Sequence, residues 1–396
     1  MLGYGRLDES SEGLLRVLLT ANSAASMVWF RLPLLRELKA RGHEVWVMAP
    51  EGWGVDQIHE TGAHFIPMHM TQGFSAERQG RKGSYFNAWV DVQTARDVRR
   101  VCRVVRPELV LHYTHKMTVV GVPAARAAGV PRVHGMITGL GLPNLHGDLK
   151  QEAIRAAYRA SIAVAGKVAD SIILLNSDNM NDLVDGGVVA SQKLFHLDGE
   201  GVDVARYAAE ARRPEPGAPV FLMVARLVRY KGVREYVEAA TAVKQRVPGA
   251  RFLLAGGYDP QHPSAVPLAD MERWRSEGNV EIIGHVTDIR ETLRGCDVFV
   301  LPSYATEGLP MSIMEAMSAS KPIITTDAPG NNETIEDGRN GILVPQKDVA
   351  ALEAAMHRLA TQPAQCEQMG RESAEIAARR FDHRVVNASL IAHLGL

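Results

Sequence analysis

Apolar residues along this chain form short continuous runs that alternate with longer segments in which an apolar residue recurs every three or four positions. The runs Leu14–Thr20 and Val45–Ala49 have the length of buried strands, and Phe30–Arg41 between them places its leucines on one helical face. The small residues of Ala21–Met27 are typical of a connecting loop. Strand, loop, helix and strand in this order predict a parallel, doubly wound sheet, whose ligands bind beyond the carboxyl ends of its strands.

The same alternation continues to residue 207 and begins again after residue 219. The segment between, Ala208–Pro219, is charged and contains Pro214, Pro216 and Pro219, which is the composition of a linker. We therefore predict an α/β protein with a loose tail at residues 1–13, a first domain at 14–207, a linker at 208–219 and a second domain from 220 onward. The apolar runs that predict strands of the second domain are Val220–Val224, Phe252–Gly257, Val280–Gly284, Asp297–Ser303 and Lys321–Asp327.

One stretch between two of these strands, Glu307–Glu315, combines a helix start with two carboxylates. Pro310 fits the first turn of a helix, where its missing N–H costs nothing. Glu307 and Glu315 would flank a bound phosphate ester and hold the hydroxyls around it, as a nucleotide sugar requires. The alternative is a loop residue and a solvated helix charge. The amides that would point out of the helix N-terminus toward a phosphate belong to Leu309, Met311 and Ser312.

Two cations follow the first strand of the second domain. Arg226 and Lys231 stand at either end of the loop that leads to a helix starting near Gly232. An arginine binds a diphosphate through its planar fork, and a lysine binds it as a point charge. Their place beyond the carboxyl end of a strand therefore predicts a diphosphate site; the alternative is a pair of surface cations.

Residues 74–107 interleave basic and aromatic side chains. Four arginines fall at positions that share one face of a predicted helix, and three further cations precede it. Such a surface suits an anionic membrane or a lipid diphosphate. A solvated helix face above core aromatics explains it equally well, and nucleic-acid binding would need a motif that is absent. The residues are Arg96, Arg99, Arg100 and Arg103, preceded by Arg78, Arg81 and Lys82.

Composition and charge narrow the class of protein. The chain has 396 residues, 46% hydrophobic and 22% charged, with a net charge of -1, which is an ordinary globular composition without a global attraction to nucleic acid. Its three cysteines are scattered, which argues against a disulfide framework and for a reducing compartment. We find neither a signal-peptide core nor an apolar run of membrane-spanning length, and expect a cytoplasmic protein. No DxD motif or His/Cys cluster has the spacing of metal ligands, so no metal is expected.

These motifs carry a resemblance to a known family. Glu307–Glu315, within E-G-L-P-M-S-I-M-E, resembles the Glu-x7-Glu signature of the retaining glycosyltransferases of family 4, and Val224–Gly232 resembles their phosphate motif. The resemblance extends from about Arg16 onward and is strongest in the C-terminal half. It implies the GT-B fold, in which two doubly wound Rossmann-like domains face a cleft. It also implies that the second domain spans residues 220–378 and that residues 379–396 form a helix that packs back on the first domain.

The first half resembles a subset of that family, the bacterial enzymes that extend polyprenyl-diphosphate-linked sugars. Tyr113–Lys116 matches the subset's Y-T-x-K, and Thr138–Gly141 matches its T-G-L-G. Many family 4 enzymes have a histidine where Thr138 stands. The nearest one here, His134, lies inside a predicted strand, where a histidine is more often a core residue than a catalytic one. The resemblance places Lys116, Thr138 and Gly139 on the acceptor side, where the seven basic residues named above are also expected because of their charge.

The resemblance implies a retaining transfer of a sugar, for which an N-acetylhexosamine is our guess, from a UDP-sugar to a polyprenyl-diphosphate-linked saccharide in bacterial glycan assembly. Arg226 and Lys231 would neutralise the diphosphate of the donor. Glu307 would hold sugar hydroxyls, and Glu315 would hold the ribose. The UDP-sugar is a substrate, so no cofactor is expected. The other residues expected on the donor side are Gly201, Gly284, His285, Val286, Leu309, Pro310 and Met311, with Ser23 and Ser26 unless these form a plain turn between strand and helix.

The expected partners are the nucleotide-sugar donor, the lipid-linked acceptor and, peripherally, the inner face of the cytoplasmic membrane, with no nucleic acid. Two other functions fit the same residues. A GT-B sugar-nucleotide epimerase or hydrolase would use the same grip on UDP but would not need the basic segment. A nucleotide-sugar-binding scaffold without catalysis is compatible with the missing histidine. Turnover separates these possibilities.

Overall fold

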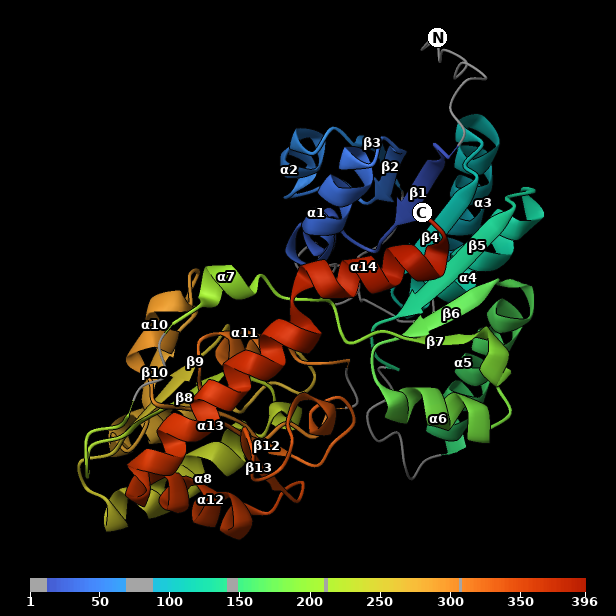
Figure 1. Cartoon of the computed structure of the whole chain (residues 1–396). Coiled ribbons are helices and arrows are strands. Elements are labelled where there is room, and N and C mark those ends of the chain that lie inside the picture. The colour runs from blue at the N-terminus through green and yellow to red at the C-terminus, as the bar shows by residue number, and fades with distance from the viewer. Residues whose placement is uncertain (1–12, 69–87, 141–148, 210–212, 306–307) are drawn as a thin grey trace.

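The computed structural model describes residues 13–68, 88–140, 149–209, 213–305 and 308–396. These residues form two domains, each a parallel sheet covered by helices, and the first domain lies above the second in Figure 1. The sheets come from separate halves of the chain, one ending at His196 and the other beginning at Val220. The doubly wound α/β class predicted from the alternation of apolar segments is confirmed.

The first sheet has seven strands in the order β3-β2-β1-β4-β5-β6-β7. The strands are β1 Arg16–Thr20, β2 Glu44–Ala49, β3 His64–Pro67, β4 Leu109–Tyr113, β5 Arg132–Ile137, β6 Ser171–Leu174 and β7 Leu194–His196. The central ones are buried almost throughout because helices cover both faces of a parallel sheet. The chain changes direction across the sheet between β1 and β4, and sheets of this kind bind ligands beyond the carboxyl ends of such strands.

The second sheet has six strands in the order β10-β9-β8-β11-β12-β13 and the same kind of switch, here between β8 and β11. The strands are β8 Val220–Val224, β9 Arg251–Ala255, β10 Glu281–Gly284, β11 Val298–Leu301, β12 Ile323–Thr326 and β13 Gly341–Val344. The loops that follow β8 and β11 are those that the sequence associates with Arg226, Lys231 and the Glu-x7-Glu motif.

Helices connect the strands. The first domain contains α1 Ala24–Ala40, α2 Val55–Glu60, α3 Ala88–Val105, α4 His115–Ala127, α5 Leu149–Val168, α6 Ser177–Asp185 and the 3-10 helix η2 Ser191–Lys193. The rest of the chain contains α7 Val204–Tyr207, η3 Arg229–Lys231, α8 Val233–Arg246, α9 Leu268–Glu277, α10 Arg290–Gly295, α11 Met311–Ser318, η4 Asn332–Thr334, α12 Val349–Thr361, α13 Pro363–Ile376, the π-helix η5 Ala377–Phe381 and α14 His383–Leu394.

The first helix begins earlier than its sequence predicts. We expected a loop to Met27 and a helix from Phe30, but α1 begins at Ala24. Ser23 caps it, because the Ser23 Oγ accepts a hydrogen bond from the Ser26 amide at 3.1 Å. The small residues that suggested a loop are therefore mostly the first turn of a helix.

Two further helix starts involve predicted residues. α4 begins at His115, so Lys116 lies in its first turn. α11 begins at Met311, and Pro310 stands just before the helix as its cap residue instead of within the first turn. The amides of that first turn still have no acceptor inside the helix, so they can still point outward to a bound anion as predicted.

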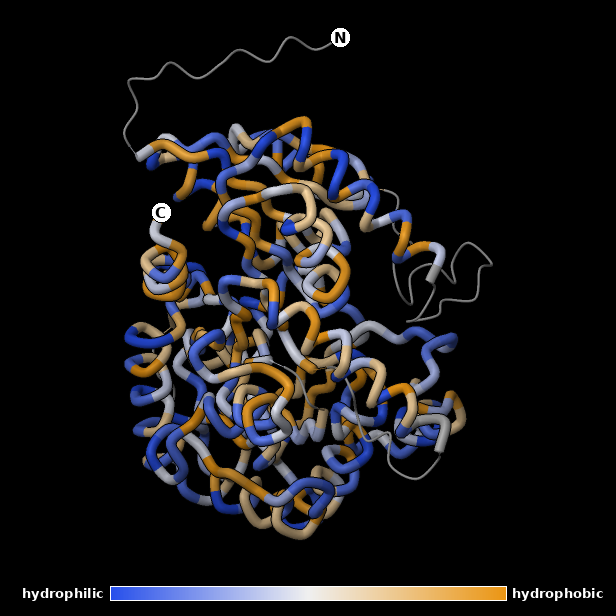
Figure 2. Tube along the Cα trace, turned by 90° about the vertical axis from the view of Figure 1, so that its right-hand side faces the viewer, coloured by the Kyte–Doolittle hydropathy of each residue, from blue (hydrophilic) through white to orange (hydrophobic). Residues whose placement is uncertain are grey.

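The last helix belongs spatially to the first domain. The buried residues of α14 join the same core as α1 and one face of β1 and β4, and Figure 1 shows α14 crossing back from the second domain. Figure 2 shows hydrophobic segments, in orange, running through both domains. The side chains that α14 contributes to this core are Val386, Leu390, Ile391 and Leu394.

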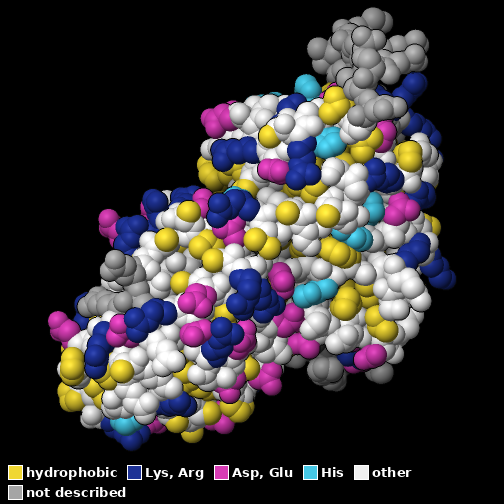
Figure 3. Space-filling model, in the orientation of Figure 1, with side chains coloured by type: hydrophobic (Ala, Val, Ile, Leu, Met, Phe, Trp, Pro, Cys, Tyr) yellow, Lys and Arg dark blue, Asp and Glu magenta, His cyan; other side chains and the backbone are white. Residues whose placement is uncertain are grey.

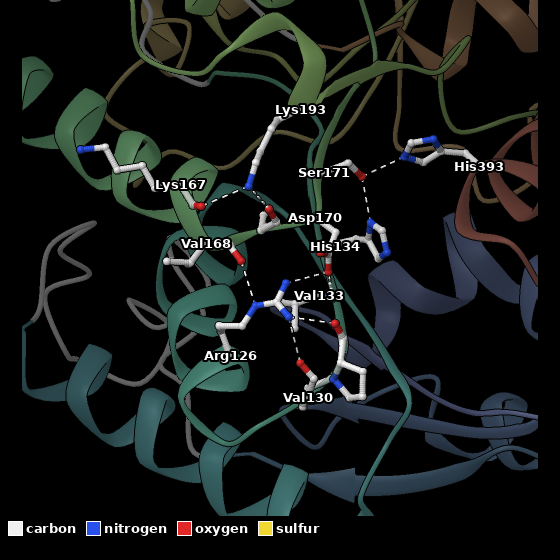
Figure 4. A network of polar contacts seen from close by, with 12 residues as sticks. Arg126, Val130, Val133, His134, Lys167, Val168, Asp170, Ser171, Lys193 and His393 are labelled. Atoms are coloured by element: carbon white, nitrogen blue, oxygen red, sulfur yellow. Dashed lines mark hydrogen bonds and ion pairs between the residues drawn. The ribbon is translucent and has the colours of Figure 1, made fainter.

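A hydrogen-bonded chain fixes the end of α14 on the first sheet. The Oγ of Ser171, at the start of β6, lies 2.8 Å from Nε2 of His393 and 2.8 Å from Nδ1 of His134 in β5 (Figure 4). Burial lowers the pKa of His134 to about 4, so its imidazole is neutral at pH 7. His134, for which the sequence allowed either a core or a catalytic role, thus helps to hold α14 in place.

The two connections between the domains run side by side. Val202, which follows β7, pairs with the chain just before α14: its N–H donates to the Phe381 carbonyl at 2.8 Å and its carbonyl accepts from the His383 N–H at 2.9 Å. The neighbouring Glu200 forms a buried ion pair with Arg31 of α1. Both crossings are therefore tied to each other and to the first domain.

Candidate active site

The two predicted cations lie at the carboxyl end of β8. Arg226 is exposed, and its Nη2 donates to the Tyr230 hydroxyl at 3.1 Å. Lys231 ends η3 and is only 8% exposed. Gly232 follows with a φ of +75°, and a Cβ there would collide with the carbonyl oxygen of Pro302. A glycine is therefore required where the lysine-bearing loop meets the loop after β11.

Hydrogen bonds between neighbouring loops fix the backbone that follows β11. The Ser303 carbonyl accepts from Asn331 Nδ2 at 2.8 Å and from the Thr326 hydroxyl. The Tyr304 amide donates to the carbonyl of Tyr230 at 3.0 Å. These contacts join the ends of β8, β11 and β12 into one rigid edge. Asn331 and Tyr230 could not be predicted for this role, because their partners are distant in the chain.

The Glu-x7-Glu segment runs from this edge into α11. Glu307 lies outside the described residues. Leu309 and Pro310 are buried, and Met311 begins the helix half-buried. The carbonyl of Pro310 accepts from the amides of Ile313 at 3.1 Å and Met314 at 3.3 Å. The earlier amides are thereby left to point out of the helix, where their partial positive charge favours an anion.

Glu315 lies on α11 and contacts the chain that leaves the first domain. Its Oε1 accepts a hydrogen bond from the hydroxyl of Tyr207, in α7, at 2.9 Å. Burial raises the pKa of Glu315 to about 7, although the Tyr207 hydrogen bond and the nearby Arg206 charge act in the opposite direction. The carboxyl is therefore poised between its two forms at neutral pH. Tyr207 was not singled out in the sequence, and its spacing from Glu315 offers no local signal.

The turn after β10 is the remaining donor-side prediction in this domain. Gly284 has a φ of +76°, and its carbonyl accepts from the Gly256 amide at 2.7 Å. His285 is exposed, whereas Val286 packs against the core. The turn therefore offers backbone groups and one free imidazole at the carboxyl edge of the sheet.

The two domains touch beside α11. A Cβ at Gly308 would collide with the carbonyl oxygen of Thr138, at the end of β5, and would lie 3.1 Å from Leu175 Cδ1. A Cβ at Gly199 would lie 3.2 Å from the Cβ of Leu309. The loop of the Glu-x7-Glu motif thus meets the carboxyl edge of the first sheet, and Thr138 lies next to the loop that carries Glu307. Gly139, one residue further, is half-buried.

Polar contacts close the same junction. The Glu333 carboxylate accepts from the Ser177 amide at 2.5 Å and from the Ser177 hydroxyl at 2.7 Å, so it caps α6 from the other domain. It also lies 3.3 Å from Nε2 of His196, and this contact raises the pKa of that histidine. Arg380 donates to Asp198 at 2.8 Å. Glu333 was not among the residues predicted for the site.

Several predicted residues are engaged elsewhere. The Ser23 and Ser26 side chains bond to the first turn of α1. Gly201, with a φ of +78°, lies against His383 at the start of α14. Lys116 pairs with Asp91 of α3, with Nζ and Oδ1 2.9 Å apart.

The basic face of α3 is formed as predicted. Arg96, Arg99, Arg100 and Arg103 are all exposed, and Arg100 pairs with Asp97 on the same helix. Lys and Arg side chains lie along the edge of the first domain where Figure 1 shows α3 (Figure 3). The other predicted cations, Arg78, Arg81 and Lys82, lie outside the described residues.

Two further findings concern membrane spans and metal sites in the described residues. None of the helices in them is long and apolar enough to cross a membrane. Across the same ranges, no three His, Cys, Asp or Glu side chains are grouped so that they could hold a metal ion.

Comparison with known proteins identifies relatives of both domains. Residues 218–362 match the family described as glycosyl transferases group 1. Over 349 residues the chain is 26% identical to the N,N'-diacetylbacillosaminyl-diphospho-undecaprenol alpha-1,3-N-acetylgalactosaminyltransferase of Campylobacter jejuni, covering 85% of this chain and 87% of that protein. It is 24% identical to the UDP-Gal:alpha-D-GlcNAc-diphosphoundecaprenol alpha-1,3-galactosyltransferase of Escherichia coli, over 68% of this chain and 70% of the relative.

Solved structures share the arrangement of the two domains. The Anabaena protein HepE in complex with UDP superimposes with a TM-score of 0.75 at 17% identity, over 96% of this chain and 99% of its own. At this identity the likeness is one of fold, and it confirms the GT-B architecture.

Proposed function

We propose that this chain, whose second domain matches the glycosyl transferases group 1 and whose fold is GT-B, is a glycosyltransferase that moves a sugar from a UDP-sugar to a saccharide carried on a polyprenyl diphosphate. The donor sugar is an N-acetylhexosamine, and the transfer retains the configuration of its anomeric carbon. The observation that carries this proposal is the match to the Campylobacter jejuni transferase, since it extends over both domains and that relative is named for an undecaprenol-diphosphate-linked acceptor.

The donor would lie along the edge formed by β8, β11 and α11. Arg226 and Lys231 would neutralise the diphosphate and stabilise the charge that develops on the departing UDP. The burial of Lys231 supports this role, because a cation removed from water interacts more strongly with a phosphate. The outward amides of α11 would add to this field, and Glu315 would hold the ribose.

Glu307 would hold hydroxyls of the transferred sugar. The acceptor hydroxyl would attack the anomeric carbon from the side that UDP leaves, and an oxygen of the departing phosphate would take its proton. The C–O bond to UDP breaks as the new glycosidic bond forms, which gives retention. Arg226 and Lys231 would neutralise the diphosphate as a metal ion does in other transferases, so the reaction would need no metal ion.

The acceptor would approach from the first domain. Thr138 lies against the loop of the Glu-x7-Glu motif, so a hydroxyl presented there would be close to the donor. The exposed arginines of α3 would contact the anionic inner face of the cytoplasmic membrane, where a polyprenyl diphosphate is anchored. Closure of the domains over both substrates would exclude water and limit hydrolysis of the donor.

The test is sugar transfer with a panel of UDP-sugars and a mixed pool of polyprenyl-diphosphate-linked sugars, with and without EDTA. Transfer to a lipid-linked product that resists EDTA is the expected result, and it names the donor. Binding of UDP without transfer to any lipid-linked acceptor would refute the acceptor class. Transfer that EDTA abolishes would refute the metal-independent mechanism.

A further inference from the structure

Two tryptophans form an exposed pair on the first domain that the proposed roles leave unused. Trp29 is 64% exposed and Trp53 is 58% exposed. Their rings lie 5.7 Å apart, centroid to centroid, with 37° between the planes. Exposing two indoles side by side in water is unfavourable, so an exposed aromatic pair of this kind points to a ligand.

The backbone holds this pair in place. Trp29 lies in the second turn of α1, and Phe30 packs edge-on against it at 6.4 Å. Trp53 is brought to α1 by Gly54, which has a φ of +104°. A Cβ at Gly54 would lie 2.8 Å from Cγ2 of Val28, so only glycine allows the loop to approach α1 this closely. The pair is therefore a built platform and not a chance contact between mobile side chains.

The platform lies on the edge of the first sheet that faces the reaction. Trp29 follows the carboxyl end of β1, and Trp53 follows that of β2. Thr138, which meets the Glu-x7-Glu loop, follows β5 on the same edge. In the sheet order, β1 and β2 stand two and three strands from β5. At roughly 5 Å between strands, the platform is about 10–15 Å from that contact along the edge.

The surrounding charges select the kind of ligand. The chain has no Lys or Arg between Gly42 and Met68, the segment that carries Trp53, whereas Glu51, Asp56 and Glu60 lie within it. The basic arginines belong to α3, which packs on the opposite face of the sheet from α1. An anionic membrane surface would therefore be drawn to α3 and not to the tryptophans. A neutral sugar ring, which presents polarised C–H groups to the face of an indole, fits an aromatic platform whose Trp53 segment carries acidic residues and no cation.

We propose that Trp29 and Trp53 bind sugar rings of the acceptor saccharide, away from the ring that receives the transferred sugar. The proposal rests on the function proposed above, because it assumes a saccharide acceptor. It gives the enzyme a means to recognise the length of the glycan: a short acceptor would reach only the Thr138 edge, and a longer one would also reach the platform.

The test compares acceptor and donor kinetics in Trp29→Ala, Trp53→Ala and a matched control, Trp89→Ala. Trp89 is also 64% exposed but lies on α3. The acceptors are polyprenyl-diphosphate-linked mono-, di- and trisaccharides with prenyl chains short enough to dissolve without vesicles. We expect the acceptor KM of the longer saccharides to rise about threefold to tenfold in the Trp29 and Trp53 variants. The donor KM should be unchanged in all three variants, and the acceptor KM should be unchanged in Trp89→Ala.

The outcomes separate this proposal from the function on which it rests. Wild-type transfer with an unchanged acceptor KM in both variants would overturn the platform and leave the proposed function standing. No wild-type transfer to any of these acceptors would overturn both. If the variants lost binding to vesicles of anionic phospholipid while keeping their KM for soluble acceptors, the platform would be a membrane contact and the saccharide assignment would be wrong.

Discussion

Burial determines the chemistry of two residues in the candidate site. Lys231 is almost fully buried at the carboxyl end of β8, so its ammonium is held in a fixed place and screened little by water. Glu315 is buried on α11, and its pKa rises to about 7 for that reason. The sequence identified both residues as charged. That both are buried was shown only by the structure.

Replacing Lys231 by alanine should remove most transfer while leaving the fold intact. The lysine acts on charge that develops in the transition state, so we expect kcat to fall about 100- to 1000-fold. Glu307→Gln should have a comparable effect on transfer. The measurement is the steady-state rate of sugar transfer, with circular dichroism as the check on folding.

The matched control is Arg234→Ala, which removes a cation on the exposed side of α8 that pairs only with Glu238 among the described ion pairs. It should transfer sugar at the wild-type rate. Near-normal rates in Lys231→Ala or in Glu307→Gln would overturn the assignment of the site.

Binding of UDP should depend on pH through Glu315. Above a pKa of about 7 the carboxyl is ionised and accepts hydrogen bonds from ribose hydroxyls more strongly than the protonated form does. UDP affinity should therefore fall about fivefold as the pH drops from 8 to 6. Calorimetric titration at several pH values measures this.

Two variants isolate the contribution of Glu315 from the titration of UDP itself. Glu315→Gln should lose this part of the pH dependence. Tyr207→Phe should move the midpoint to higher pH, because the Tyr207 hydroxyl lowers the pKa of Glu315. An identical pH profile in wild type and Glu315→Gln would show that the carboxylate does not contact the nucleotide.

Among the helices, α3 best shows what an isolated element can and cannot reveal. Its heptad-like spacing of arginines predicted one exposed basic face, and the structure has that face. The pattern does not distinguish a solvated face from one that binds a membrane, because both require the same exposed charges. Only a binding measurement separates the two.

Replacing Arg96, Arg99, Arg100 and Arg103 by glutamine should weaken binding to anionic vesicles. Each cation near such a surface contributes on the order of 1 kcal/mol, so the loss should exceed 100-fold at low salt. UDP affinity should not change, since its site lies in the other domain. Vesicle co-sedimentation over a range of salt concentrations measures the effect.

A variant of equal charge change serves as the control: glutamine at Arg273, Arg275, Arg371 and Arg379, which are exposed on the second domain. If both quadruple variants lost vesicle binding equally, net charge and not the face of α3 would be responsible. If the α3 variant lost UDP binding as well, the separation of the two sites would be wrong.

At the scale of the whole molecule, the site depends on how closely the two domains approach. Gly308 allows the Glu-x7-Glu loop to touch the end of β5, and a side chain there has no room. Glu333 and Arg380 join the domains at the same junction. The relative position of donor and acceptor edges is therefore set by a few contacts between loops.

Gly308→Ala should separate binding from transfer. Its Cβ would collide with the Thr138 carbonyl and push the domains apart, and a displacement of about 1 Å between reacting groups can lower a rate about 100-fold. UDP affinity should stay within about twofold, since the donor contacts named here come mainly from the second domain. Single-turnover transfer and UDP titration measure the two effects.

Gly295→Ala is the control, because a Cβ at Gly295 meets no atom within 4 Å. It should transfer sugar normally. If Gly308→Ala also kept the wild-type rate, close approach of these two loops would not be needed for catalysis.

The sequence alone determined the order of strands and helices and the loops that carry the chemistry. Hydrophobic periodicity is a local property, so the runs that became β1, β8 and β11 could be read directly. In a parallel sheet the loops after such strands share one edge, so placing Arg226 and Lys231 on that edge needed no tertiary information. The early start of α1 was missed because its capping serine stands among small residues that are equally common in loops.

The tertiary structure decided which distant residues meet. Glu315 and Tyr207 are 108 positions apart and Glu333 and Ser177 are 156 apart, and no local pattern records either pair. The contact of Gly308 with the end of β5 depends on how two folded domains dock. Docking is set by the shapes of complete surfaces, which form only after each sheet has buried its own core, so it cannot be read from the spacing of residues along the chain.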